Sequence, residues 1–221
     1  MPTDTIIANQ PDYLVLNKAA GNSLHSENEP GLVQQWQTEL NQALYPVHRL
    51  DKATSGVLLL AKNHAQASQY SQYFAKRECQ KFYIALATGK PKKKQGWVKG
   101  DMIKARGGSY RLTTSHNNPA ITQFFSYSLA PGLRLYVLKP ITGKTHQLRV
   151  AMKSLGVAIL GDERYGGDKS DRCYLHAWQL NLPKAELSWQ ATELQGQLFE
   201  QHQVGQWLKQ LGPLEAIPWP G

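Results

Sequence analysis

The sequence predicts an α+β protein made of a single domain, in which helices flank a mixed, mostly antiparallel β-sheet. Two features support this class. Apolar runs typical of buried strands alternate with segments whose apolar residues recur at helical spacing, and four extended segments follow one another between residues 97 and 140. Of the 221 residues, 41% are hydrophobic, so the chain can bury a substantial core, which argues against a disordered protein.

The first 90 residues are expected to form three strands and two helices. The strands are short apolar runs bounded by turn-forming or charged residues, and the helices carry apolar residues three or four positions apart. Asn63 is well suited to cap the second helix, because its side chain can accept a hydrogen bond from a first-turn amide. In chain order we predict a strand over 13–18, a helix after Gly31 that extends to Leu44, a strand over 57–61, a helix that ends near Glu78 and a strand over 81–88.

The rest of the chain is expected to be richer in strands. The connection at 130–132 is typical of a hairpin. The apolar period becomes helical from Thr145 to Leu155, with Thr145 as the expected N-cap and Gly156 as the C-cap. The other predicted elements are strands over 97–104, 109–114, 120–128 and 133–140, strands near 173–180 and 186–191, and a last helix around 200–211.

Positive charge is concentrated in the middle of the sequence. The 25 lysines and arginines exceed the 16 acidic residues by 9, and residues 49–185 alone hold 23 of those bases and 7 of those acids, a net charge of +16. The flanking segments, 1–48 and 186–221, carry −4 and −3. A basic centre of this kind is typical of a surface that binds a polyanion. Solvated lysines would give the same composition, so charge alone leaves both interpretations open.

Several classes of protein are excluded by patterns that the sequence lacks. No apolar run reaches 18 residues and the start of the chain has no secretory signal pattern, so we expect no membrane span and a cytoplasmic location. Cys79 and Cys173 form no paired motif, which fits a reduced compartment. Glycine-rich phosphate loops, paired zinc-ligand motifs and serine nucleophile elbows are all missing. We therefore expect neither a metal nor a cofactor.

The segment from His48 to Gly56 places several polar side chains directly before the apolar strand expected at 57–61. A loop held against a buried strand is a rigid mount for reactive groups. In an extended chain Arg49 and Asp51 point the same way, and an arginine beside a carboxylate keeps it ionised and available as a nucleophile or base. An ordinary loop in which Asp51 caps a turn is the alternative interpretation.

A second polar segment, Gly143–Arg149, contains the start of the helix expected from Thr145. The first amides of a helix, together with Lys144, would suit a phosphate group. Arg149 follows His146 by about one turn, so both side chains can face one cleft. A solvated basic helix face is the alternative.

Aromatic and basic residues in the predicted strand 81–88 and in the loop after it suggest contacts with a nucleic acid. Tyr83 lies mid-strand with Lys81 on the same face. A tyrosine in a strand is usually part of the core, whereas at an RNA site its ring can stack on an extruded base. The run Lys92–Lys94 fits either a phosphate-contacting loop or a solvated one.

These segments resemble the motifs of one enzyme family. His48–Gly56 reads HRLDKATSG and resembles the signature of RluA-type pseudouridine synthases, which is His-Arg-Leu-Asp, two variable positions, then Thr-Ser-Gly. Asp12–Gly21 is similar to the family's first strand and its Asn-Lys-Pro-x-Gly turn. The resemblance spans about residues 6–183. Further matches follow in family order over 81–86, 143–150, 161–167 and 175–177.

The resemblance implies a pseudouridine synthase fold with a central catalytic cleft, and isomerisation of specific uridines in ribosomal or transfer RNA without a cofactor. It implies that Asp51 is the nucleophile, Arg149 its ion-pair partner, and Tyr83 the ring against the base and a candidate proton acceptor from C5. Arg49 is expected to occupy the gap left by the flipped nucleotide. By the same resemblance, RNA contacts are expected from His48, Arg49, Lys52, Thr54, Lys81, Lys144, His146 and Gln147.

Three positions depart from the family pattern where RNA contacts are set. Alanine replaces the usual proline at Ala19, Lys144 stands where arginine is common, and Ala151 occupies a position often filled by histidine. The chain starts directly at the first catalytic strand. We therefore expect one catalytic domain over residues 1–221, without the S4-like RNA-binding domain that many relatives carry upstream, and a monomer.

Two other functions compete with this one. A non-catalytic RNA-binding or chaperone protein would keep the fold without turnover, and the presence of Asp51, Tyr83 and Arg149 argues against it. A nucleoside hydrolase of the glycosidase type needs two carboxylates flanking the bond, and only Asp51 has a suitable setting.

Overall fold

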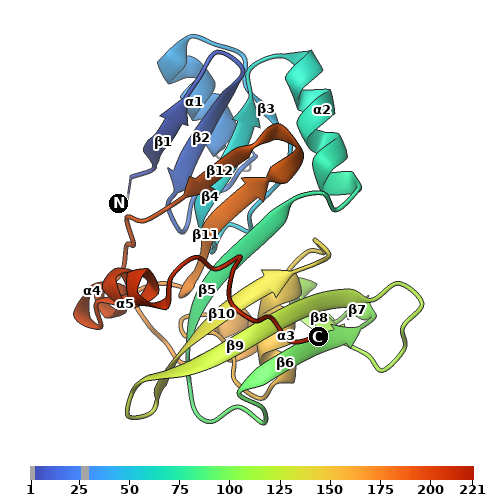
Figure 1. Cartoon of the computed structure of the whole chain (residues 1–221), viewed down its shortest axis with the longest axis vertical. Coiled ribbons are helices and arrows are strands. Elements are labelled where there is room, and N and C mark those ends of the chain that lie inside the picture. Colours follow the sequence, from blue (N-terminus) through green and yellow to red (C-terminus); the bar gives the residue numbers. More distant parts are fainter. Residues whose placement is uncertain (1–2, 26–29) are drawn as a thin grey trace. The chain divides into compact units, whose positions relative to one another are not determined.

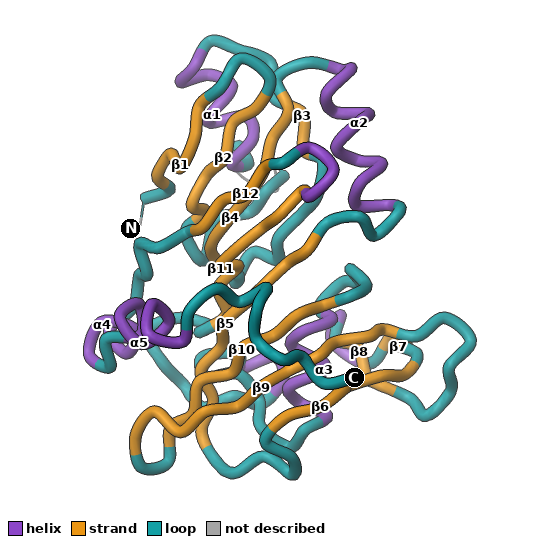
Figure 2. The backbone as a smooth tube through the Cα atoms, viewed as in Figure 1, coloured by secondary structure: helices purple, strands orange, loops and turns teal. Residues whose placement is uncertain are grey.

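The chain crosses three times between two units, each with its own strands and helices (Figure 1, Figure 2). The structure is a computed structural model that describes residues 3–25 and 30–221. The first unit comprises Met1–Gln80 and Ala177–Glu193, and the second comprises Lys81–His176 and Leu194–Gly221. Every strand pair whose register is described is antiparallel, which confirms the predicted α+β class with a mostly antiparallel arrangement.

The first unit is a layer of strands with helices packed on it. Its elements are β1 (Thr5–Asn9), β2 (Tyr13–Lys18), α1 (Leu32–Leu40), β3 (Tyr45–Pro46), β4 (Ser55–Ala61), α2 (His64–Ala75), most of β11 (Leu175–Leu182) and β12 (Leu187–Gln190). The strand order is β1-β2-β4-β11, with β3 beside β4 and β12 beside β11. Every residue of β4 is buried, as predicted for a strand covered on both faces.

Apolar side chains join α2 to the strands of the first unit. Val15, Val57 and Leu59 are at most 1% exposed. They pack in one cluster with Tyr70 of α2 and Trp189 of β12. This cluster holds β4 in place, and β4 directly follows the polar segment that begins at His48. The segment is thus anchored to a rigid strand.

The second unit has an antiparallel sheet and, apart from it, a small hairpin. Its elements are β5 (Gln80–Thr88, except for Gln80), β6 (Gln95–Gly100), β7 (Met102–Lys104), β8 (Tyr110–Leu112), β9 (Ala120–Ala130), β10 (Leu133–Pro140), α3 (Gln147–Ser154), α4 (Gln197–Gln201) and α5 (Val204–Leu211). The sheet has the order β5-β10-β9-β6, while β7 pairs only with β8. Figure 1 shows α3 behind these strands and the C-terminal segment in front of them.

The two faces of the second unit's sheet have different covers. On one face α3 is fixed by Gln147, whose Nε2 donates to the Thr122 hydroxyl of β9 at 3.0 Å. On the other face Trp219 packs on Phe82, with ring centroids 5.9 Å apart. Since neighbouring strand residues point to opposite faces, Tyr83 belongs to the face that α3 covers. That face therefore carries both Tyr83 and the helix that begins after His146.

The caps test two predicted helix starts, of which one is confirmed and one is wrong. Asn63 caps α2 as expected, because its Oδ1 accepts from the Gln66 amide at 2.9 Å. Thr145 is not the N-cap of α3. The N-cap is His146, which adopts a left-handed conformation with φ 59° and makes no side-chain cap hydrogen bond.

The expected last helix over 200–211 is two helices, α4 and α5. The helical conformation is interrupted at Gln203, which, like His146, is left-handed, with φ 47°. The apolar spacing of both segments fits one helix, so periodicity alone hid the break. The sequence did not predict β1, because none of its residues is buried and they alternate only weakly between half-buried and exposed.

Gly56 shows why the Thr-Ser-Gly sequence ends in glycine. Its φ is +109°, and a Cβ built on it would lie 2.2 Å from the Ala177 carbonyl oxygen of β11. No side chain fits between these two backbones. The close approach locks the start of β4 against β11.

We predict that Gly56→Ala lowers the free energy of unfolding by about 2 kcal/mol or more, because the added methyl meets backbone that cannot yield. The comparison is made by thermal and urea unfolding. Gly205→Ala in α5 is the control, since a Cβ there meets nothing within 4 Å and helix propensity improves. Equal stabilities of the Gly56 variant and the wild type would contradict the packing described here.

Candidate active site

The segment that carries Asp51 is a tight turn in the first unit. The Thr54 amide donates to the Asp51 carbonyl oxygen at 2.9 Å and closes the turn. Leu50 is 5% exposed and points into the core. Arg49 and Lys52 on either side are exposed, and Asp51 is half-buried. The turn therefore presents one carboxylate at the edge of the core with two cations in solvent beside it.

A buried lysine holds the backbone of this turn. Lys18 is 0% exposed, and its ammonium donates to the carbonyl oxygens of Ala19 at 2.8 Å, Lys52 at 3.2 Å and Thr54 at 2.9 Å. The Gly21 amide also donates to the Lys52 carbonyl, at 2.8 Å. A buried cation is tolerated only where oxygen atoms surround it. Lys18 thus fixes the backbone on both sides of Ala53, shortly after Asp51.

His48 and Thr54, which were expected to contact RNA, have structural contacts. The Leu59 amide donates to His48 Nε2 at 2.9 Å. The His48 ring also stacks on Phe74 of α2, with centroids 4.6 Å apart. Thr54 is 3% exposed. Of the charged side chains in this segment, Arg49 and Lys52 are exposed and Asp51 is half-buried.

In the second unit, Arg149 forms a buried ion pair with Asp162. Arg149 is 6% exposed and Asp162 2%. Arg149 Nε donates to Asp162 Oδ2 at 2.8 Å and Nη2 to Oδ1 at 2.7 Å, which is the bidentate geometry of a strong pair. The guanidinium carbon also lies 4.9 Å from the centroid of the Tyr165 ring. The orientation of Arg149 is therefore set by a carboxylate and an aromatic ring.

Tyr165 links Arg149 to the left-handed His146. The Tyr165 hydroxyl lies 2.8 Å from His146 Nδ1 and accepts from the Tyr110 amide at 3.0 Å. The Tyr110 and Tyr165 rings each meet the His146 ring edge-on, with centroids 5.7 Å apart. A non-glycine residue in a left-handed conformation is strained, and these contacts hold it there.

Gln147 supports the site from inside the second unit. It is 5% exposed, and its Oε1 accepts from the Thr142 hydroxyl at 2.7 Å and from the Lys144 amide at 3.0 Å. Its Nε2 donates to the Ile121 carbonyl and to Thr122, both at 3.0 Å. Both ends of the amide are thus engaged inside the unit, where they hold the loop before α3.

The two lysines expected to bind RNA in this unit lie beside the same loop. Lys81 Nζ donates to the Thr142 carbonyl at 3.4 Å, one residue before Gly143. Lys144 Nζ donates to the Asn118 carbonyl. The Asn118 loop is itself fastened by Asp101, whose carboxylate accepts from the Asn118 amide at 2.8 Å.

The pKa of the Asp101 carboxyl shows the balance of effects in that loop. Desolvation raises this pKa, but the Ser115 hydroxyl, the Asn118 and Asn117 amides and the Lys144 charge together lower it below its ordinary value. Asp101 therefore stays ionised at neutral pH and keeps the loop closed beside Lys144.

The expected catalytic residues divide between the units. Asp51 belongs to the first, with Arg49 and Lys52, whereas Tyr83 on β5 and Arg149 on α3 belong to the second. Tyr83 is half-buried and lies opposite Leu138 of β10.

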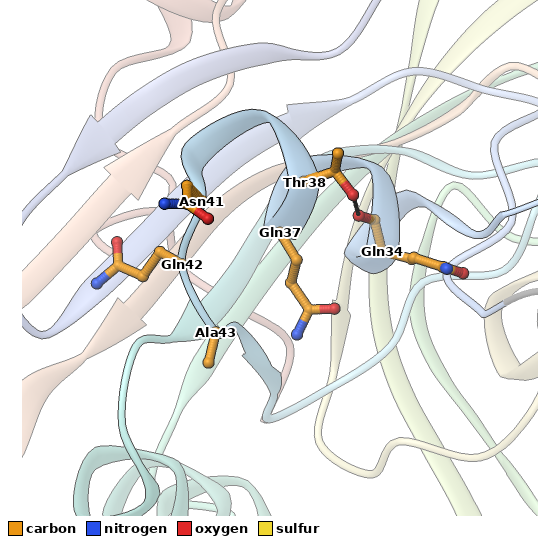
Figure 3. A pocket seen from close by; sticks show the side chains of 6 residues that line it. All are labelled: Gln34, Gln37, Thr38, Asn41, Gln42 and Ala43. Carbon is orange, nitrogen blue, oxygen red and sulfur yellow. Dashed lines mark hydrogen bonds between the residues drawn. The ribbon is translucent and has the colours of Figure 1, made fainter.

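A shallow hollow in the first unit offers no alternative catalytic centre. Figure 3 shows it beside α1, lined by uncharged side chains that do not titrate at neutral pH. General acid–base chemistry needs a titratable group, so we assign no catalysis to it. Its lining residues are Gln34, Gln37, Thr38, Asn41, Gln42 and Ala43.

Two further properties concern metals and membranes. Within residues 3–25 and 30–221, no three histidine, cysteine or acidic side chains come together as metal ligands. No helix in that part of the chain has both the length and the apolar character needed to cross a membrane.

Sequence reasoning missed three residues of this site: Lys18, Asp162 and Tyr165. Each lies in a segment that resembles a family motif, so the signal was present. Their roles were hidden because a lysine after an apolar strand and an aspartate after glycine are both typical of turns. Only the folded chain brings Lys18 to the Asp51 turn and Asp162 to Arg149.

Known proteins that are similar to this chain belong to one family. A family model described as RNA pseudouridylate synthase matches residues 6–154. The chain is 50% identical over 181 residues to an uncharacterized RNA pseudouridine synthase of Haemophilus influenzae, across 80% of this chain and 81% of that protein. It is 37% identical to the ribosomal large subunit pseudouridine synthase C of Rickettsia bellii, across 82% of this chain and 64% of the relative.

Solved structures share the fold. Human RNA pseudouridylate synthase domain containing 4 has 26% identity and a TM-score of 0.69, over 90% of this chain and 91% of that one. Human RNA pseudouridylate synthase domain containing 1 has 24% identity and a TM-score of 0.71, over 92% and 95%, which shows the fold alone.

The fold, together with these matches, defines an RNA-modifying isomerase. The chain belongs to the RNA pseudouridylate synthase family. It converts uridine in RNA to pseudouridine, as the family match and the named relatives indicate.

We predict that Asp162→Asn lowers the free energy of unfolding by about 3 kcal/mol, because it leaves the buried Arg149 charge without a balancing carboxylate. Pseudouridine formation should fall about 100-fold as the guanidinium loses its fixed orientation. Unfolding and turnover are measured on the same preparation. Glu163→Gln changes the exposed neighbouring acid and should leave both unaltered; equal behaviour of the two variants would refute the role of the ion pair.

Proposed function

We propose that the protein isomerises uridines of large-subunit ribosomal RNA with Asp51 as the nucleophile. The observation that carries the catalytic part is the Asp51 turn, in which a half-buried carboxylate stands on a backbone fixed by the ammonium of Lys18. A reactive group must be held in place for its attack to be efficient, and the turn supplies that rigidity.

The reaction needs no oxidant and no reductant. The C1′–N1 bond of uridine breaks, the freed uracil rotates, and a bond forms between its C5 and C1′. The proton lost from C5 is matched by one gained at N1, so atoms and electrons balance. What the protein has to supply is a carboxylate, a pocket that retains the base, and a means of taking the nucleotide out of its stack.

In this proposal Arg149 is the ion-pair partner of Asp51. The bidentate pair with Asp162 occupies Nε and Nη2 of Arg149, and it holds the guanidinium plane in one orientation. Tyr83 is proposed to stack against the uracil and to accept the proton from C5, since it is half-buried on the face that α3 covers.

The second unit is proposed to supply most of the attraction for the RNA backbone. It holds 18 of the 25 lysines and arginines and 7 of the 16 acidic residues, a net charge of +11, whereas the first unit has 7 and 9, a net charge of −2. Phosphate neutralisation dominates nucleic-acid affinity. The exposed Arg49 of the first unit is proposed to fill the gap left by the flipped uridine.

The choice of large-subunit ribosomal RNA rests on a relative. The Rickettsia bellii protein bears that RNA in its name and aligns with 82% of this chain. Transfer RNA is the competing substrate, because its loops also offer single-stranded uridines. We further propose a cytoplasmic monomer with a single catalytic domain, in keeping with the sequence.

The RNA target can be mapped in cells with and without this gene. We expect pseudouridine at one or a few uridines of large-subunit ribosomal RNA to disappear when the gene is deleted and to return with the wild-type copy. A copy carrying Asp51→Asn is the control and should not restore them. Loss confined to transfer RNA would overturn the ribosomal assignment and leave the chemistry intact.

We predict that Asp51→Asn lowers turnover at least about 1,000-fold, because the amide cannot attack as a carboxylate does. The affinity for RNA should stay within about threefold, since the phosphate contacts remain. Turnover is measured on a transcript that contains the mapped uridine, and affinity by filter binding. Glu39→Gln, on the exposed face of α1, should match the wild type. Full activity of the Asp51 variant would remove this residue from its role.

A further inference from the structure

The N-terminal segment fastens the turn that follows β2. The Asp4 carboxylate accepts from the Ala19 amide at 2.5 Å through Oδ1 and from the Asn22 side-chain amide at 2.9 Å through Oδ2. Ala19 is 0% exposed. A buried backbone amide needs an acceptor, and a carboxylate is a stronger one than a neutral oxygen. Both oxygens of Asp4 are thus engaged with one four-residue turn.

The same turn holds the backbone next to Asp51. Lys18 donates to the carbonyl oxygens of Lys52 and Thr54, and the Gly21 amide donates to the Lys52 carbonyl. Along the chain, Lys18 and Gly21, which bind the Asp51 turn, therefore alternate with Ala19 and Asn22, which bind Asp4. Gly21 has φ +95°, in a region that glycine enters without strain and can also leave easily. The direction of its amide therefore depends on how the two ends of the turn are held.

We propose that Asp4 is a positioning residue for the catalytic turn. This inference rests on the proposed role of Asp51. Asp4 touches no reacting atom. It fixes the backbone over Lys18–Asn22. That segment holds the carbonyl oxygens of Lys52 and Thr54, and these set the direction of the Asp51 side chain.

The alanine at position 19 explains why such a contact is useful here. The resembling family usually carries proline at this position, and proline has no amide hydrogen and a φ that its ring restricts. Ala19 has both a donor to satisfy and a freer backbone. Asp4 supplies the acceptor and, through Asn22, a second attachment. The substitution in the motif and the contact from the N-terminal segment thus compensate for each other.

The first test replaces the carboxylate and follows the turn directly. In Asp4→Ala, hydrogen exchange of the Ala19, Gly21 and Thr54 amides should accelerate about tenfold or more, while the Leu59 amide of β4 stays protected. Asp4→Asn keeps an acceptor for Ala19 and should restore slow exchange. Asp12→Ala, an exposed aspartate between β1 and β2, is the matched control. Unchanged exchange at Gly21 and Thr54 in Asp4→Ala overturns the proposal.

The second test separates positioning from folding. We expect Asp4→Ala to lower kcat about tenfold with KM within about twofold, because misplacing a reactive group slows the chemical step and leaves RNA binding intact. Asp4→Asn should recover most of the loss. Faster exchange with an unaltered kcat would mean that Asp4 stabilises the turn without positioning Asp51, and would overturn the inference.

A combined variant tests the link with position 19. Ala19→Pro removes the donor that Asp4 binds, so adding Asp4→Ala to it should cost less than about twofold in kcat. If the double variant lost kcat by the product of the two single losses, the link between positions 4 and 19 would be contradicted. If instead the wild type forms no pseudouridine, or Asp51→Asn is fully active, the proposed function fails; the exchange data on Asp4 still decide whether it holds the turn.

Discussion

Each unit encloses a cation that solvent barely reaches. Because a buried cation needs oxygen partners, it holds in place the segments of the candidate site that supply them. Lys18 is 0% exposed in the first unit and Arg149 is 6% exposed in the second. Lys18 is satisfied by backbone carbonyls of the Asp51 turn, and Arg149 by the carboxylate of Asp162. A buried cation without oxygen partners would cost more than a protein of ordinary stability can bear, so these loops have little freedom to move.

The remaining charge is arranged around these two fixed points. The net positive charge lies entirely in the second unit, and two of its lysines, Lys81 and Lys144, stand beside the loop that leads into α3. The first unit is slightly acidic and contains the proposed nucleophile, Asp51. In the proposed function the second unit supplies most of the affinity, while residues of both units take part in the chemistry, which is consistent with a substrate that is mostly phosphate and a reaction that involves one base.

Much of this could be predicted from the sequence, and the misses have physical reasons. The apolar run of β4 and the capping residue of α2 predicted those elements correctly, because their signals are local. The left-handed His146 and Gln203 were missed, since both adopt a conformation that their residue types rarely choose and that tertiary contacts impose. Asp51 came from a motif, whereas the partners Lys18 and Asp162 depend on approaches between distant segments that no periodicity encodes.

We propose that the fixed carboxylate of Asp51 performs an isomerisation and is not a remnant in a protein that only binds RNA. Release of tritium from large-subunit ribosomal RNA labelled at uridine C5 measures that step directly, because the C5 hydrogen leaves when the new C5–C1′ bond is formed. We expect the wild type to release tritium in proportion to the pseudouridine made. Tight binding of that RNA with no release of tritium, from either ribosomal or transfer RNA, would contradict it.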